Sequence, residues 1–508
     1  MSDSRTRNSV KNASINISAK IVTMICSFVI RTIFLKYLGD QYTGVSTLFT
    51  DLLNVLSFTE LGIGTAISFS LYKPIANNDY YRIAQLMKLY KYIYISISST
   101  VFFLGILLIP FLDLFVKDVP EIKESITTIY IMYLIKTSLS YLLVYKSTLV
   151  IAKQKQFIVT AVESSCTVIK TVLDVILLIT SKNFMVYLWL EIARVVATNL
   201  IISIYSKRHL QSINLNVKIE KEDFISLFNN VKDVFLYKIS GIVLSSTGNI
   251  ITSMFVSVTS VTLLSNYNMI VSALNNMVYQ VTSAVTASVG NLAVVKTKDE
   301  QREVFYTINF ICFIFSVLEC TGLWMCANSF VELLWGEQYV LNSSIVALLC
   351  INVFFVNMHL SIDMFRTANG MFRKGRLRPL ATAIINLIVS LIAVQYLELF
   401  GVWLGIVVAR LFTQTWYDPK IVFNNIFNCS VKKYYMKYVS YMFVTTGICV
   451  VGTLLKYFIP ETTGIKFLFG FLYAVIVSAI IIILLFRKTK EYQNTKMYFC
   501  LLLKNNRA

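Results

Sequence analysis

The chain has 508 residues, of which 56% are hydrophobic and only 14% are charged. A soluble domain carries about a quarter charged residues, so this composition excludes an ordinary soluble protein and makes a bilayer the solvent for most of the chain. The formal net charge of +19 would suggest a nucleic-acid partner for a soluble protein. The placement of the basic residues, described below, argues against nucleic acid.

Apolar segments long enough to cross a membrane recur along the whole chain. The first follows 14 polar residues and has no small-residue cleavage site, so we predict no removable signal peptide. Because lipid-exposed backbone must satisfy its own hydrogen bonds, every span is expected to be a helix. The fourteen predicted spans are 15–38, 43–72, 92–116, 125–145, 157–180, 184–206, 234–258, 261–290, 304–328, 340–363, 378–397, 400–417, 436–459 and 464–486. The predicted fold class is therefore an all-α polytopic membrane protein.

Lys and Arg are distributed unevenly between the connections. One alternate set, which includes both ends of the chain, holds 33 of them, whereas the opposite set holds 6. Cytoplasmic connections carry the excess of positive charge, so we predict a multi-pass membrane protein with both termini in the cytoplasm. The basic residues then line the inner leaflet and orient the chain.

The longest inner connection, 207–232, divides the first twelve spans into six and six. We predict an N-terminal lobe at 1–206, a cytoplasmic linker at 207–232, a C-terminal lobe at 233–424, and helices 13 and 14 with a tail at 425–508. Within the linker, Phe224, Leu227 and Phe228 share one helical face, which predicts a short interfacial helix.

The sequence lacks the usual signatures of enzymes and metal sites. Its nine cysteines form no CxxC pair and it has only two histidines, so we expect neither a disulfide framework nor a metal centre. No Walker motif, Ser-His-Asp arrangement or HExxH motif is present. We predict no cofactor and no enzymatic activity; the enzymatic alternative is an integral-membrane glycosyl- or acyltransferase.

Charged residues occur inside the predicted spans, where each costs about 2.5–3.5 kcal/mol on insertion scales. They imply a water-filled cavity or ion pairs between helices. The basic ones are Lys20, Arg31, Lys136, Lys170, Arg194, Lys238 and Arg410, and the acidic ones are Asp51, Glu60, Glu163, Asp174, Glu191 and Glu319. Lys20 and Lys238 lie near cytoplasmic ends and are expected to extend toward the interface.

Two interpretations stay open for these charges. Lys170 shares a helical face with Glu163 and Asp174, and Arg194 lies one turn from Glu191, so these groups either neutralise each other or face a cavity.

Arg31 and Arg410 have no local acidic partner. Each needs an acid on another helix, such as Asp51 or Glu319, or an anionic ligand. A guanidinium suits phosphate because it donates two parallel hydrogen bonds and keeps its charge. Glu60, beside Gly62 and Gly64, is either an ion-coupling group or a structural partner of Arg31.

Three stretches carry a resemblance to a known family. They are FVIRTIFLKYLGDQYTGVSTLFTDLLNVLSFTELGIGTAISFSLYKPIANND at 28–79, YKISGIVLSSTGNIITSMFVSVTSVTLLSNYNMI at 237–270, and FRTANGMFRKGRLRPLATAIINLIVSLIAV at 365–394 with GVWLGIVVAR and WYDPKIVFNNIF behind it. They resemble the polysaccharide (O-unit or repeat-unit) flippases of the multidrug/oligosaccharidyl-lipid/polysaccharide exporter superfamily. The branch found in Gram-positive capsule and exopolysaccharide clusters is the most similar.

The resemblance implies two six-helix lobes around a central cavity, as in MATE transporters, with two appended helices. It implies alternating-access transfer of an undecaprenyl-diphosphate-linked oligosaccharide to the outer leaflet of a bacterial cell membrane, with membrane lipid and a polysaccharide polymerase as further partners. Arg31 falls at the family's first-span arginine. Glu60, Gly62 and Gly64 match its second-span element. The connection between spans ten and eleven is matched by Arg366, Gly370, Arg376 and Pro379.

From these arguments we predict two sets of site residues. The hypothesised substrate-binding residues of the cavity are Arg31, Lys136, Lys170, Arg194 and Arg410. The hypothesised coupling or structural acids are Asp51, Glu60 and Glu319. Many relatives carry an acid in the seventh span where this chain has Gly248 and Asn249, and drug antiporters carry one in the first span, which has none here. The alternative is another transporter of the superfamily, a lipid II flippase or a drug/cation antiporter.

Overall fold

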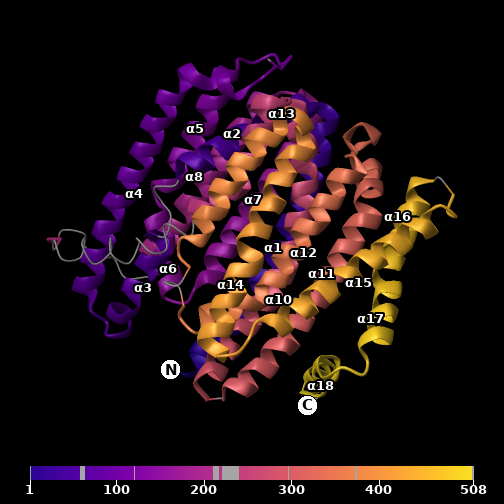
Figure 1. The fold of residues 1–508 in the computed structure, drawn as a ribbon. Helices are drawn as coiled ribbons and strands as arrows, with labels where there is room; N and C mark the ends of the chain where they lie inside the picture. The colour runs from indigo at the N-terminus through magenta and orange to yellow at the C-terminus, as the bar shows by residue number, and fades with distance from the viewer. Residues whose placement is uncertain are drawn as a thin grey trace. The chain divides into compact units, whose positions relative to one another are not determined.

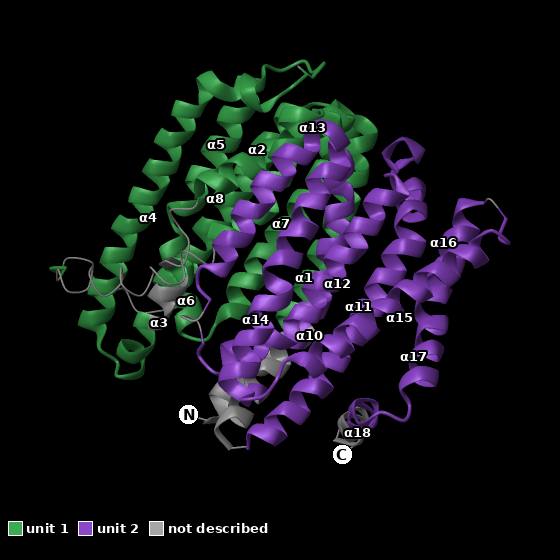
Figure 2. Cartoon of the chain, viewed as in Figure 1, with its two compact units in different colours: residues 1–262 green, residues 263–508 purple. Residues whose placement is uncertain are grey.

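The computed structural model describes residues 2–57, 63–118, 120–209, 217–219, 239–295, 297–371, 375–460 and 462–505. These residues form helices joined by short connections and contain no β-strand (Figure 1). The all-α prediction is confirmed. Contacts divide the chain into two compact units, residues 1–262 and 263–508 (Figure 2). The lobe boundaries at 206 and 233 stay a prediction.

Unit 1 is a bundle of helices that pack in pairs. α1 packs along α7 and α7 packs along α8, while α5 contacts α2, α4 and α8. The helices are α1 (Ser2–Tyr37), α2 (Asp40–Leu56), α3 (Ile63–Ala76), α4 (Tyr80–Leu108), η2 (Ile109–Phe115), α5 (Ile126–Tyr141), α6 (Val144–Ala152), α7 (Gln156–Ser181) and α8 (Phe184–His209). A further apolar helix covers Ile239–Phe255. The packing of α1, α5, α7 and α8 brings together the charged residues considered below.

Capping side chains explain where several of these helices begin. The Asp79 carboxylate accepts a hydrogen bond from the Arg82 backbone N–H at the start of α4, and Ser125 accepts one from Thr128 at the start of α5. Both satisfy backbone donors that a helix N-terminus leaves free. Pro110 marks the change from α4 to the 3₁₀ helix η2. Local sequence therefore sets these boundaries.

Unit 2 is built around the antiparallel pair α11 and α12. α11 also contacts α15, α16 and α18, and α12 contacts α13 and α14. The elements are α10 (Val258–Val295, which begins in unit 1), α11 (Lys298–Trp335), η3 (Glu337–Tyr339), α12 (Ser343–Ala368), α13 (Arg378–Phe412), α14 (Gln414–Val422), η4 (Phe423–Phe427), α15 (Lys432–Lys456), α16 (Thr463–Leu472), η5 (Tyr473–Val477), α17 (Ser478–Phe486) and α18 (Lys490–Asn505). A capping box of Thr297 and Glu300 starts α11.

A break at Glu398 turns α13 back on itself. Its backbone angles are φ 47° and ψ −128°, which no helix contains, so α13 holds the two spans predicted at 378–397 and 400–417. After the break, Gly401 faces the backbone of Ala393, and Gly405 faces the side chain and backbone of Ser390, so a Cβ at either position would collide. Small residues four apart allow this close packing of the two limbs.

Nine helices among the described residues are long and apolar enough to cross a membrane. All fourteen predicted segments fall on helices, although the second and seventh include residues outside the described ranges. The number of candidate helices is lower than the number of predicted spans, partly for local reasons. α7 carries Glu163, Lys170 and Asp174, which lower its hydropathy, and the helix Ile239–Phe255 is short. The predicted polytopic membrane fold is confirmed.

Candidate functional site

Three predicted cations of unit 1 surround one carboxylate. Glu191 of α8 lies with Oε1 2.7 Å from Lys170 Nζ of α7, and its Oε2 is 3.3 Å from Arg194 Nη2 and 3.7 Å from Lys136 Nζ of α5. Lys170 Nζ also lies 2.5 Å from Asp174 Oδ2, one turn along α7. The helices α5, α7 and α8 thus join in one ion-pair network, which we call the Glu191 cluster (Lys136, Lys170, Asp174, Glu191 and Arg194).

Two tyrosines connect Arg31 of α1 to this cluster. Lys170 Nζ lies 4.0 Å from the centre of the Tyr187 ring, and Lys136 Nζ lies 4.8 Å from that of Tyr133. Arg31 lies near both phenols. Aromatic rings attract cations through their π faces. The Tyr187 ring is held in turn by Phe34 and Phe184, at 4.9 and 6.0 Å between ring centres.

Positive charge exceeds negative charge here. The three bases of the Glu191 cluster contact two carboxylates, Glu191 and Asp174. Arg31 adds a fourth positive charge near Tyr133 and Tyr187, and Glu163 interacts with Arg194 from farther away. The bases also differ in access. The Lys170 side chain is 8% exposed, whereas those of Lys136 and Arg194 are 22% and 28% exposed. Lys170 is therefore enclosed by its acids, whereas Lys136 and Arg194 are partly accessible.

The structure narrows the alternatives for Arg31. Within the described ranges, no carboxylate forms an ion pair with its guanidinium. Asp51, one acid that we expected as a partner, instead accepts a hydrogen bond from Asn249 Nδ2 at 2.7 Å. The other acid suggested for it in the second span, Glu60, lies outside the described residues, as do Gly62, Lys238 and the predicted interfacial helix. Among the described residues Arg31 therefore has no acid as an ion-pair partner, and its use of an anionic ligand stays a prediction.

Unit 2 contains a second charged cluster, which the sequence reasoning missed. Asp418 of α14 is fully buried, and its carboxylate lies 2.7 Å from Arg378 Nη2, 3.4 Å from Arg366 Nη1 and 3.3 Å from His359 Nε2. These partners belong to α13 and α12. The acid therefore ties three helices together, and it is well neutralised by its two arginines. Asp418 lies in the quoted stretch WYDPKIVFNNIF, where an acid after an apolar run was the available signal.

Arg410 and Glu319 are the predicted site residues of unit 2, and neither forms an ion pair with Asp418 among the described residues. Arg410 Nη1 of α13 donates to Gln414 Oε1 at 2.8 Å. Glu319 of α11 accepts a hydrogen bond from Asn357 Nδ2 of α12 at 2.6 Å. The suggested pairing of Arg410 with Glu319 does not occur among the described contacts.

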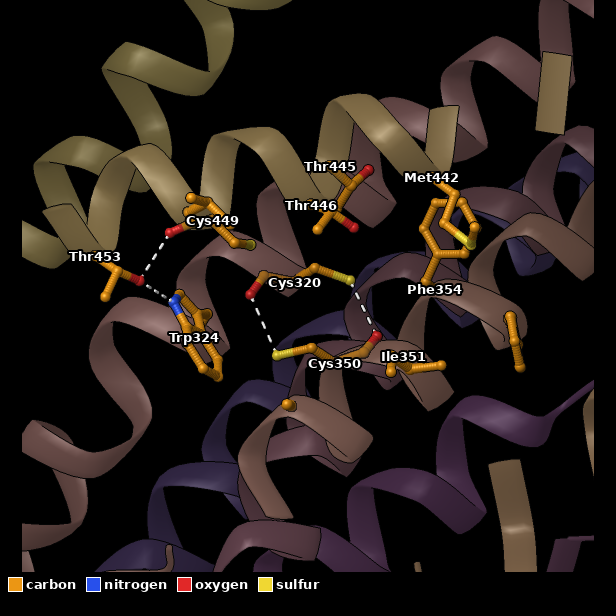
Figure 3. Close-up of a pocket in the computed structure, with 13 residues that line it drawn as sticks. Cys320, Trp324, Cys350, Ile351, Phe354, Met442, Thr445, Thr446, Cys449 and Thr453 are labelled. Carbon is orange, nitrogen blue, oxygen red and sulfur yellow. Dashed lines mark hydrogen bonds between the residues drawn. The ribbon is translucent and has the colours of Figure 1, made fainter. Parts of the chain in front are cut away.

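Unit 2 also contains an apolar pocket of about 270 Å³ between α11, α12 and α15 (Figure 3). Several polar groups of its wall are bonded to each other. Trp324 Nε1 donates to Thr453 Oγ1, and the thiols of Cys320 and Cys350 each donate to the carbonyl of the other residue. Such a lining is poorly suited to bind a charged group. The pocket therefore differs in kind from the cation-rich region of unit 1.

Sequence comparison identifies no relative: the chain matches no protein-family model and no curated protein. Solved structures do share its fold. A structure described as the lipid II flippase MurJ in an inward closed conformation is 12% identical, covers 93% of this chain and 98% of its own, and has a TM-score of 0.66.

Two MATE transporters are also similar. An inward-facing multidrug resistance MATE family transporter of the MOP superfamily is 15% identical over 79% of this chain and 95% of its own, with a TM-score of 0.63. The eukaryotic MATE transporter AtDTX14 is 16% identical over 80% and 92%, with a TM-score of 0.53. At these identities the likeness establishes the fold, and the function must be argued from the site.

Proposed function

We propose that this protein is a flippase that moves a polyprenyl-diphosphate-linked oligosaccharide repeat unit from the inner to the outer leaflet of a bacterial cell membrane. The observation that carries the proposal is the excess of cations around Tyr133 and Tyr187 in unit 1. A diphosphate has the opposite charge. Its lipid tail can stay in the bilayer while its polar head crosses through the protein.

The four cations have different roles in this proposal. Arg31, Lys136 and Arg194 bind the diphosphate, because they are incompletely neutralised and Arg31 has a guanidinium that donates in parallel to phosphate oxygens. Lys170 holds Glu191 and Asp174 in place. Glu191 keeps Lys136 and Arg194 close together despite their repulsion, so the site is organised before the ligand arrives.

The energy of outward transfer is partly electrical. A membrane potential that is positive outside favours outward movement of negative charge by about 2.3 kcal/mol per charge per 100 mV. A difference in affinity between inward-open and outward-open states supplies the rest. The fold supports this alternation, since the similar solved structures are described as transporters in inward-facing and inward closed states.

The second candidate is another transporter of the same superfamily. The similar structure described as a lipid II flippase favours a different polyprenyl-linked cargo, and the same cation-rich site would bind it. A drug or cation antiporter fits less well, because unit 1 presents excess positive charge and would repel an organic cation. The first span also contains no acid.

The test is a gene deletion in the host, followed by assays of surface polysaccharide and of undecaprenyl-linked units in the inner leaflet. We expect lost polymer, accumulated inner-leaflet units, rescue by the wild type and failed rescue by Arg31→Ala. The matched control is Lys36→Ala, which removes an exposed cation from the same helix and is expected to rescue.

Each outcome has a defined meaning once equal membrane levels of the variants are verified. Normal polymer in a deletion strain without a redundant flippase contradicts the sugar-lipid substrate, and lipid II transfer and drug efflux are then measured. Full rescue by Arg31→Ala keeps the function and contradicts the role of Arg31 in binding.

A further inference from the structure

The interface between α11 and α12 in unit 2 contains a row of buried polar side chains. Ser361 Oγ of α12 donates to Asn309 Oδ1 of α11 at 2.9 Å. Farther along the same pair of helices, Asn357 Nδ2 donates to Glu319 Oε2 at 2.6 Å. Asn357 is 1% exposed and Glu319 is 7% exposed. A carboxyl group is therefore enclosed between two membrane-spanning helices.

Glu319 differs from Asp174 and Asp418, the other acids below 9% exposure among the described residues, in having no neutralising base. Asp418 binds two arginines and Glu191 adjoins three bases. Across the part of unit 2 that the structure describes, no Lys, Arg or His forms an ion pair with Glu319, and Asn357 supplies its hydrogen bond. An ionised carboxylate buried without a countercharge is strongly disfavoured.

The ionisable groups on the surrounding helices do not supply that countercharge. On α11 itself the neighbouring group is Cys320, which lines the apolar pocket (Figure 3). The packed helices contribute thiols and phenols that are neutral near pH 7, and charged groups that already have partners. Cys350 of α12 and Cys449 and Tyr438 of α15 lie near Cys320, and Tyr473 of η5 lies near Cys449. On α12, His359 and Arg366 contact Asp418, and Asp363 is a further acid rather than a countercharge. On α15, Lys437 pairs with Glu491 of α18.

The amide group of Asn357 needs a hydrogen-bond donor that an ionised Glu319 cannot supply. The amide oxygen Oδ1 of Asn357 is buried and accepts no hydrogen bond from the described residues. A carboxylate can only accept, whereas a neutral carboxylic acid also donates one O–H. A proton on Glu319 would supply the missing donor, and the acid and the amide would then form a closed pair of hydrogen bonds. A buried acceptor without a donor costs about 1–3 kcal/mol.

We propose that Glu319 is a proton-binding site, in which the side chain is held as a neutral carboxylic acid at neutral pH by its pairing with Asn357. The proton leaves when α11 and α12 separate enough to admit water. This site lies outside the Glu191 cluster and does not depend on the transported substrate. It gives unit 2 one exchangeable proton within the membrane.

The test is infrared difference spectroscopy of the purified full-length protein in lipid nanodiscs, without substrate. At pH 7 the wild type is expected to show the C=O band of a protonated carboxylic acid, shifted in D₂O. Glu319→Gln should remove that band. The control Glu303→Gln, which changes an exposed acid on the same helix, should retain it. No such band in the wild type, or an unchanged band in Glu319→Gln, overturns the proposal.

A second variant keeps the proposal testable if Glu319→Gln fails to fold. Asn357→Leu keeps the acid but removes both hydrogen bonds, so the band should persist at higher frequency. An unshifted band in Asn357→Leu contradicts the pairing. Since Gln mimics a neutral acid, Glu319→Gln should also melt within a few degrees of the wild type, and a large loss of stability indicates an ionised Glu319. Because no transport is measured, these results are independent of the proposed function.

Discussion

Lys170 of α7 and Glu191 of α8 form the ion pair at the centre of the charged region of unit 1, with 2.7 Å between Nζ and Oε1. The residues are 21 positions apart, and the turn between α7 and α8 brings them together. Glu191 also adjoins Lys136 and Arg194. The Glu191 carboxylate thus offsets the mutual repulsion of three bases that lie close together within the membrane.

Glu191→Gln is expected to destabilise the protein by about 3–5 kcal/mol, the usual cost of removing one partner from a buried ion pair. The three bases would lose their common countercharge. Unfolding of the purified protein in mixed micelles measures this change. Glu163→Gln, which changes an exposed acid on α7, should alter stability by less than about 0.5 kcal/mol. Equal effects of the two variants would mean that the network contributes little.

Lys136→Gln and Arg194→Gln are each expected to weaken binding of undecaprenyl diphosphate about tenfold, which corresponds to about 1.4 kcal/mol. Lys170→Gln should instead lower stability, because its base is enclosed by Asp174 and Glu191. Titration of the protein in nanodiscs measures affinity, and Lys36→Ala is the control. If Lys170→Gln alone weakened binding, the division of roles between the bases would be wrong.

Asp418→Asn should destabilise unit 2 by about 3–5 kcal/mol, because Arg366 and Arg378 would remain buried without their acid. The same charge change at Asp299, whose side chain is 83% exposed in its pair with Arg302, should have little effect. Combining Asp418→Asn with Arg378→Gln measures their coupling. Strictly additive losses would show that the two side chains do not interact.

Gly405→Ala is expected to destabilise the packing of the two limbs of α13, because the added methyl group would meet the Ser390 side chain and backbone. Overpacking of this kind costs about 1–3 kcal/mol. The control is Gly447→Ala in α15, where a Cβ meets no atom within 4 Å and alanine should be neutral or stabilising. Thermal melting of both variants tests the prediction, and a neutral Gly405→Ala would contradict the close contact between the limbs.

The contact that Glu491 of α18 forms with α15 is expected to depend on pH. Burial alone would raise the pKa of Glu491, but the hydrogen bond from Lys437 Nζ, at 2.6 Å, a backbone hydrogen bond and the charges of Lys437 and Lys433 together hold the pKa below its usual value of 4.5. A depressed carboxyl pKa stabilises the fold above the unfolded pKa, and this contribution is lost as the pH falls through the folded value.

The wild type should therefore be more stable than Glu491→Gln at pH 7, and the difference should disappear below about pH 4. The expected size is about 0.2–1 kcal/mol, because solvent screens a partly exposed pair. Hydrogen exchange of α18 measures it. A difference that is constant with pH would exclude the Glu491 charge as its source.

The sequence by itself determined the helices and identified the charged residues within them. Both properties are local: about 20 apolar residues span a bilayer, and a charge such as Arg31 is conspicuous in FVIRTIF because the apolar span around it, 15–38, contains no acid. The ion pairs within a helix, Lys170 with Asp174 and Glu191 with Arg194, were likewise foreseeable from their spacing.

Only the tertiary structure decided which charges meet across helices. Asp51 is equally plausible from the sequence as a partner of Arg31, yet α2 turns it toward Asn249. Asp418 acquires its arginines from α12 and α13, and Glu319 acquires none among the described residues. The reason is physical: inside a membrane the cost of a charge depends on what the neighbouring helices place beside it, and helix packing, unlike hydropathy, is not a property of any single segment.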